Sequence, residues 1–122
     1  MKIISFNVNG IQQILKKHFD DNKKINVLHH LIATENPDFL CLQEIRCSSK
    51  FQWSPPKKGN FFESKTEYHT FTFHSEHGKG YSGTLVCSKI KPLNVTYGVP
   101  NIVEREGRVI TLEFEKFYIV NV

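Results

Sequence analysis

Two short apolar runs, separated by a helix-type pattern, constrain the fold of this chain more than any other feature of its sequence. Residues 2–8 and 38–43 are nearly continuous in apolar side chains, which is typical of strands that are buried on both faces. Between these runs, leucine and isoleucine repeat at intervals of three and four residues, which predicts a helix over residues 25–35 that ends before Pro37. A connection of this length predicts that the two strands lie parallel in one sheet.

The remaining segments predict a second helix and several shorter strands. Residues 11–19 are predicted to begin a helix, and Asp21 or Asn22 is the candidate N-cap of the helix over residues 25–35. Residues 48–65 contain the prolines and the glycine of an irregular surface loop. Apolar or alternating patterns, separated by glycine and proline, predict strands at 68–74, 83–88, 93–97, 108–114 and 117–122, with a hairpin at Glu115 and Lys116 joining the last two.

Length and composition indicate a single globular domain. The chain has 122 residues, of which 39% are hydrophobic and 23% are charged, and this composition argues against disorder. No apolar run approaches the roughly 20 residues of a membrane helix, so we expect a soluble, intracellular protein with no membrane partner. Cys41, Cys47 and Cys87 form no CxxC pair, which favours a reducing compartment. The net charge of +4 is compatible with a polyanionic partner.

Asn7 and Glu44 stand where the two buried strands are predicted to end. Ligands of α/β sheets collect at the carboxyl ends of parallel strands, so we expect these two side chains to share a site. A carboxylate beside a neutral oxygen suits Mg²⁺, which keeps several of its waters and would serve phosphate-ester chemistry. Taken by itself, the pattern is more typical of a turn-forming asparagine and a solvated glutamate.

Four motifs resemble those of a known enzyme family. They are "KIISFNVNGI", "PDFLCLQEIRC", "GYSGTLVCSK" and "EGRVITLEFEKFYIVNV". Their order and approximate spacing resemble the exonuclease III family of apurinic/apyrimidinic endonucleases, within the endonuclease/exonuclease/phosphatase superfamily. The resemblance runs from residue 1 to residue 122. It implies one half of a two-sheet α/β sandwich, with a mixed sheet and with helices on the outer face.

The resemblance assigns catalytic and metal-binding residues. Asn7 matches the active-site asparagine of the family and Glu44 matches its metal-binding glutamate, which together imply Mg²⁺ or Mn²⁺ as cofactor. Asn9 falls where many relatives carry an aspartate, so any negative charge from that position is lost here.

The resemblance also assigns residues that contact DNA. Backbone amides, a tyrosine hydroxyl and arginines are suitable phosphate ligands that hold the protein in register without reading bases. The expected DNA-binding residues are Asn9, Arg46, Gly80, Tyr81, Ser82 and Arg108, with Gly83 in the same loop.

The implied function is DNA repair by metal-dependent hydrolysis of the phosphodiester 5′ to an abasic site. In the family, the active site is completed by a tyrosine just beyond "FYIVNV" and, later, by an Asp-x-Asn pair, another aspartate and an Asp-His pair. Residues 1–122 are therefore expected to be the amino-terminal part of the domain, incomplete at the carboxyl end and inactive alone. The expected partners are abasic duplex DNA and a missing carboxyl-terminal half, in cis or in trans. Self-association through a sheet face left open by the missing half is the alternative.

Other functions remain open at this point. The chain could be a non-catalytic DNA-binding or interaction module derived from this fold, or a phosphatase or nuclease that acts on other esters. A structural zinc site is not expected, because His74, His77 and Cys87 lack a second close pair of ligands.

Overall fold

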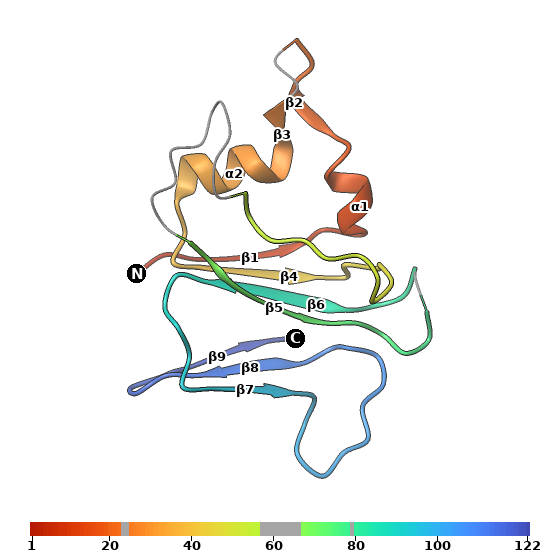
Figure 1. Cartoon of the computed structure of the whole chain (residues 1–122), viewed down its shortest axis with the longest axis vertical. Helices are drawn as coiled ribbons and strands as arrows, with labels where there is room; N and C mark the ends of the chain where they lie inside the picture. Colours follow the sequence, from red (N-terminus) through yellow and green to blue (C-terminus); the bar gives the residue numbers. More distant parts are fainter. Residues whose placement is uncertain (23–24, 57–66, 79) are drawn as a thin grey trace.

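The computed structural model describes residues 1–22, 25–56, 67–78 and 80–122, which form three layers. A four-stranded sheet lies in the middle, and Figure 1 shows helices on one of its faces and a three-stranded sheet on the other. The elements in chain order are β1 (Ile3–Asn7), α1 (Ile11–Ile14), β2 (His18–Asp20), β3 (Ile25–Asn26), α2 (Val27–Glu35), β4 (Phe39–Gln43), β5 (His69–Phe73), β6 (Thr84–Ser88), β7 (Asn94–Tyr97), β8 (Ile110–Glu113) and β9 (Tyr118–Asn121).

The larger sheet has the strand order β1-β4-β6-β5 and is mixed. β1 and β4 pair in parallel with the register Ile3↔Phe39 through Asn7↔Gln43, whereas β6 pairs antiparallel with both β4 and β5. The predicted parallel pair and the predicted mixed α/β sheet are therefore confirmed.

The central strands of this sheet are covered on both faces. Leu40 and Leu42 of β4 pack in a cluster with the helices, and Phe39 and Cys41 pack in a second cluster with β8 and β9. The expectation of an open sheet face is thus wrong for the centre of the sheet, because β7, β8 and β9 cover it. Full burial of residues 2–8 is also wrong, since β1 is an edge strand in which Ile3 is 51% exposed.

The segment before α2 differs from the prediction. α1 is a single turn, and a short β2–β3 hairpin replaces the rest of the helix expected over residues 11–19. Asn26, rather than Asp21 or Asn22, caps α2, because its Oδ1 accepts hydrogen bonds from the amides of Leu28 and His29. Its Nδ2 donates to the carbonyls that end α1, so one buried amide joins both helices.

The strands of the second half lie close to their predicted positions. β8 and β9 form the predicted hairpin, which the amide of Phe114 closes by donating to the carbonyl of Phe117 at 2.9 Å. Residues 48–56 of the predicted loop contain no helix or strand, and residues 57–65 lie outside the described residues. Within the described part of the chain, no helix has the length and apolarity needed to cross a membrane.

Of the glycines that the structure describes, Gly107 has the least space for a side chain, and we expect the free energy of unfolding to depend on it. A Cβ at Gly107 would lie 2.5 Å from the carbonyl oxygen of Phe73, whereas one at Gly78 would meet no atom within 4 Å, and both residues have positive φ. We predict that Gly107→Ala lowers the free energy of unfolding by about 2–4 kcal/mol through strain and overpacking, and that Gly78→Ala lowers it by only about 1–2 kcal/mol through strain. Urea denaturation measures both, and equal losses would contradict the packing.

Candidate active site at the carboxyl ends of the parallel strands

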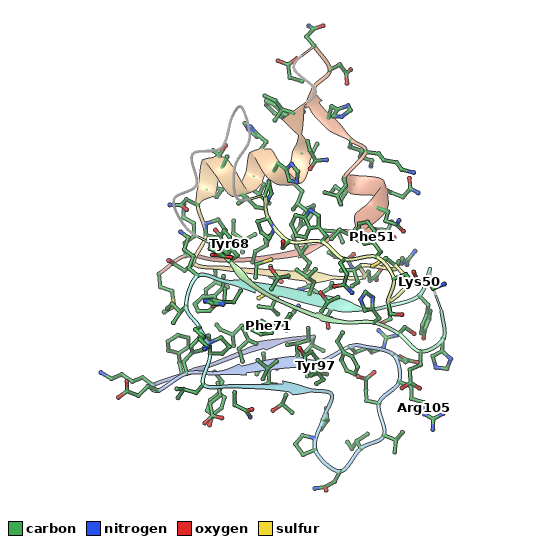
Figure 2. The ribbon with its side chains drawn as sticks, viewed as in Figure 1. Lys50, Phe51, Tyr68, Phe71, Tyr97 and Arg105 are labelled. Carbon is green, nitrogen blue, oxygen red and sulfur yellow. The ribbon has the colours of Figure 1, made fainter. Side chains whose placement is uncertain are left out.

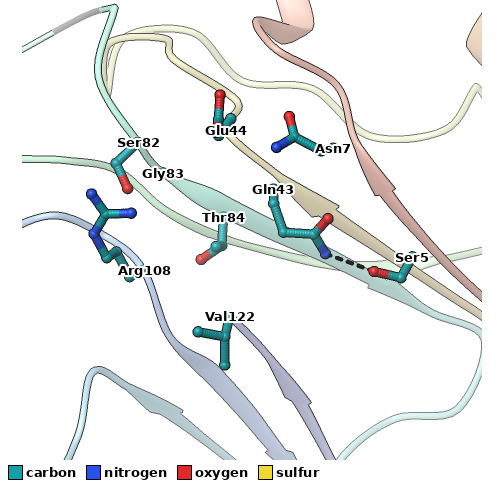
Figure 3. A pocket seen from close by; sticks show the side chains of 9 residues that line it. All are labelled: Ser5, Asn7, Gln43, Glu44, Ser82, Gly83, Thr84, Arg108 and Val122. Atoms are coloured by element: carbon teal, nitrogen blue, oxygen red, sulfur yellow. Dashed lines mark hydrogen bonds between the residues drawn. The ribbon is translucent and has the colours of Figure 1, made fainter.

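The strand register builds a row of polar residues at one edge of the larger sheet. Asn7 pairs with Gln43, and Gln43 pairs with Thr84, so the carboxyl ends of β1 and β4 meet the start of β6. A pocket of about 340 Å³ lies at this edge (Figure 3), and the residues that line it are Ser5, Asn7, Gln43, Glu44, Ser82, Gly83, Thr84, Arg108 and Val122.

Half of the residues expected to act at the site line this pocket. Asn7, Glu44, Ser82 and Arg108 come together there from four separate segments of the chain. The other residues expected to bind DNA, which are Asn9, Arg46, Gly80 and Tyr81, lie in the loops that build the pocket or beside them.

Backbone hydrogen bonds hold these loops together. The amide of Gly10 donates to the carbonyl of Glu44 at 2.8 Å, and the amide of Arg46 donates to the carbonyl of Ser82 at 2.9 Å. The amide of Gly80 in turn donates to the carbonyl of Arg46 at 3.0 Å. The positions of the pocket side chains are therefore set by main-chain contacts between three loops.

Several of these loop residues have an unfavourable backbone conformation. Non-glycine residues with positive φ include Asn9, Glu44, Arg46 and Ser82, with φ between 46° and 53°. Such conformations cost about 1–3 kcal/mol each, persist only where the surroundings impose them, and cluster at functional sites. Their concentration at this one edge marks it as the candidate active site.

The two asparagines of the first loop form a local turn. The amide of Asn9 donates to Oδ1 of Asn7 at 3.0 Å, which is the geometry of an Asx-turn. This contact orients the Asn7 carboxamide at the end of β1. The side chain of Asn9 does not line the pocket.

Glu44 is the carboxylate of the pocket, and a basic side chain neutralises it. Its Oε2 lies 2.8 Å from Nη2 of Arg46, and both side chains are partly exposed, Arg46 by 43% and Glu44 by 38%. Within the described part of the chain, no group of three or more His, Cys, Asp or Glu residues could hold a metal ion. The donor set of Glu44 and Asn7 nevertheless fits Mg²⁺, which takes one or two protein carboxylates and retains water.

Arg108 belongs to a second charged cluster at the rim. Its Nε donates to Oε2 of Glu106, its Nη2 donates to the Tyr81 hydroxyl at 3.2 Å, and that hydroxyl donates to Oε1 of Glu106 at 3.1 Å. The guanidinium also lies 5.6 Å from the centre of the Tyr81 ring. The hydrogen bond from Arg108 is the main reason why the pKa of Glu106 lies below its ordinary value.

Some residues of the site were missed from the sequence. Gln43 and Thr84 were not predicted, because they reach the site through strand pairing with Asn7 and the register of that pairing is known only from the structure. Glu106 was not predicted either, because it meets Arg108 and Tyr81 only where the chain turns at Gly107, which has a φ of 68°. Ser5 and Val122 gave no signal.

The residues that were considered for zinc contact different neighbours. Nδ1 of His74 lies 3.8 Å from Sγ of Cys47, and the His77 ring packs 5.9 Å from the ring of Tyr81. Cys87 is a buried free thiol in β6, and burial is the main reason why its pKa is raised to about 12.

We predict that Arg108→Gln raises the pKa of Glu106 towards its ordinary value. In the native chain this carboxylate stays ionised to lower pH than an ordinary glutamate, and the ion pair is lost as the pH falls through the lowered pKa. The carboxyl carbon chemical shift of Glu106, followed as a function of pH, measures this change. Arg105→Gln is the control, because Arg105 lies 3.8 Å from Glu76 instead. Identical titration of Glu106 in the native chain and in Arg108→Gln would refute the pairing.

Comparison with known proteins places this geometry among solved folds. An AP endonuclease structure from Archaeoglobus fulgidus superposes with a TM-score of 0.67 at 23% identity, covering 98% of this chain and 39% of that one. The superposition shows a shared fold.

Sequence relatives extend over almost the whole chain. The "DNA-(apurinic or apyrimidinic site) endonuclease" of Dictyostelium discoideum is 41% identical over 123 residues, which is 99% of this chain and 29% of that protein. The "DNA repair nuclease APEX1" of Danio rerio is 39% identical over 122 residues, which is 98% of this chain and 34% of that protein. The chain thus spans about a third of the length of these relatives. The model of the Endonuclease/Exonuclease/phosphatase family matches residues 4–122, and the chain belongs to that family.

Proposed function

We propose that this chain is the amino-terminal part of a DNA repair nuclease that hydrolyses the phosphodiester 5′ to an abasic site with the help of a divalent metal ion. The observation that carries the proposal is the pocket in which Asn7 and Glu44 meet Arg108. The names of the Dictyostelium and Danio relatives, which the chain matches over almost its whole length, support DNA repair and the abasic site.

Glu44 and Asn7 are the residues that would hold Mg²⁺ or Mn²⁺. When bound there, the ion would neutralise the negative charge on the phosphate oxygens and on the leaving oxygen. Oε2 of Glu44 is engaged by Arg46, and the second carboxylate oxygen has no hydrogen bond within the described residues. The carboxylate can therefore accept a cation without first losing a buried contact.

The basic and polar side chains around the pocket are suited to the DNA backbone. Arg46 and Arg108 provide charge, and Tyr81 and Ser82 provide hydroxyl groups. Gly80 is an exposed glycine, and Asn9 provides an exposed carboxamide. Contacts of these kinds position a duplex without reading its sequence, which suits an enzyme that recognises a lesion.

The pocket lacks groups that the reaction needs. Hydrolysis requires a residue to activate or orient water and further donors for the charge that develops at phosphorus. None of the 9 residues that line the pocket is a histidine or an aspartate. We infer that a further segment of the whole protein, in cis or in trans, completes the site and that residues 1–122 alone are inactive.

A non-catalytic DNA-binding module is the second candidate function. It is favoured because Glu44 is the one side-chain carboxylate among the residues that line the pocket. Such a module would bind duplex DNA weakly and in a salt-sensitive manner, without cleaving it.

We predict that this chain cleaves DNA once the rest of the fold is supplied. In a chimera, residues 1–122 replace the matched segment of the Dictyostelium endonuclease, and the substrate is a duplex with one abasic site and Mg²⁺. The chimera should nick the strand 5′ to the lesion. Glu44→Gln should slow nicking by about 100-fold or more, because a bound metal contributes several kcal/mol to catalysis.

The control for this experiment is Glu115→Gln, which changes an exposed glutamate in the β8–β9 hairpin and should leave the rate unchanged. A folded chimera that binds the duplex without nicking it would favour the non-catalytic module. Strong nicking by residues 1–122 alone, abolished by Glu44→Gln, would show that the pocket needs no second segment.

The exposed edges of the two sheets indicate where that segment would pack. β1 and β9 are edge strands, and Ile3, Tyr118, Val120 and Val122 are between 51% and 70% exposed. Edge strands with exposed apolar side chains are sites at which another chain segment can pair. We propose that the completing segment covers β1 and β9.

We predict that Val120→Lys weakens association with the completing segment by roughly 10-fold, which corresponds to about 1.4 kcal/mol. Isothermal titration calorimetry of this chain with the unmatched part of the Dictyostelium endonuclease measures the affinity. Val103→Lys is the control, since Val103 is 82% exposed in the loop between β7 and β8. Equal affinities of the two variants would argue against docking at β9. Self-association of the chain that is lost only in Val120→Lys would identify a second copy as the partner.

A further inference from the structure

A buried asparagine links the two sheets beneath the pocket. Asn121 of β9 is 2% exposed, and its Nδ2 donates to the carbonyl oxygens of Leu42 at 2.9 Å and Leu85 at 3.1 Å. Carbonyl oxygens only accept hydrogen bonds, so the amide group of Asn121 must face them. Its Oδ1 is therefore an acceptor that points towards the neighbouring side chain of Gln43.

This arrangement determines which way the Gln43 carboxamide points. Nε2 of Gln43 lies 2.6 Å from Oδ1 of Asn121, 3.0 Å from Oγ of Ser5 and 3.3 Å from the carbonyl oxygen of Cys41. Because Oδ1 of Asn121 accepts, the atom that faces it must be a donor, and the reversed amide would place two acceptors together.

These contacts of Nε2 leave Oε1 of Gln43 as a hydrogen-bond acceptor with a fixed orientation in the pocket. Oε1 of Gln43 has no hydrogen bond within the described residues, and it is not among their buried polar atoms that lack a partner, so it is accessible to solvent. Figure 3 shows this oxygen directed away from Ser5, on the side where Asn7 lies. Gln43, Asn7 and Glu44 thus place oxygen atoms in one pocket.

We propose that Gln43 is a metal-positioning residue whose Oε1 accepts a hydrogen bond from the hydration shell of the divalent cation held at Glu44. The inference rests on the proposed metal site. Mg²⁺ keeps several waters when it binds, and those waters are donors that require acceptors. Asn121 acts through Gln43, because it holds the carboxamide in the orientation that exposes the oxygen.

The test uses hexaamminecobalt(III) as the probe, because its ammine ligands do not exchange and report contacts made through the outer shell of a hydrated cation. The chain is titrated with the probe while the side-chain Cδ chemical shifts of Gln43 and Glu44 are followed by nuclear magnetic resonance. Both resonances should shift with the same saturation curve. This measurement needs no variant and therefore does not depend on how a substitution folds.

A substitution removes the oxygen of Gln43. Gln43→Met should weaken binding of the probe by roughly 10-fold, the lower end of the usual effect of losing an outer-shell partner. Gln52→Met, in the loop that follows β4, is the matched control and should leave binding unchanged.

The outcomes distinguish this inference from the proposed function. A shift of Glu44 without any shift of Gln43, or equal affinities of Gln43→Met and Gln52→Met, would overturn the role of Gln43 and leave the metal site standing. No shift at either residue, with the probe or in a parallel titration with Mg²⁺, would overturn both, because Mg²⁺ can also take the Glu44 carboxylate as a direct ligand.

Discussion

The parallel register between β1 and β4 is the constraint on which the rest of the site depends. It places Asn7 beside Gln43 and brings the loops that follow both strands to the same edge of the sheet. A shift of one residue would turn the side chains of β4 to the opposite faces and remove Gln43 from Asn121. The two apolar clusters on either side of the sheet hold this register, so the core positions the polar atoms of the pocket.

Charge in and around the pocket is balanced by pairs of neighbouring residues. Arg46 pairs with Glu44, and Arg108 pairs with Glu106. Each arginine is therefore partly neutralised, and in the proposed function a cation at Glu44 would release Arg46 for a phosphate. Because linkage is reciprocal, cation binding and phosphate binding should strengthen each other through this pair. Exposed pairs of this kind contribute little to stability and can be exchanged at low cost.

The parts of the fold that could be predicted from the sequence are those that depend on local pattern. The parallel strands and the helix between them follow from apolar spacing, and Asn7 and Glu44 follow from the ends of those strands. The N-cap of α2 was not predicted, because Asn26 is held in place by a hydrogen bond to a carbonyl of α1, and only the folded chain brings the two together. The orientation of Gln43 was also beyond prediction, since it depends on Asn121 at the far end of the chain.

Anomalous X-ray scattering from crystals that contain Mn²⁺ would test the central claim most directly. The claim is that a carboxylate and a carboxamide at one strand-end edge hold a divalent cation where a phosphate can reach it. The account predicts an anomalous peak in the pocket between the side chains of Asn7 and Glu44, and its loss in Glu44→Gln. A pocket without a peak at saturating Mn²⁺, or a peak that persists in Glu44→Gln, would contradict it.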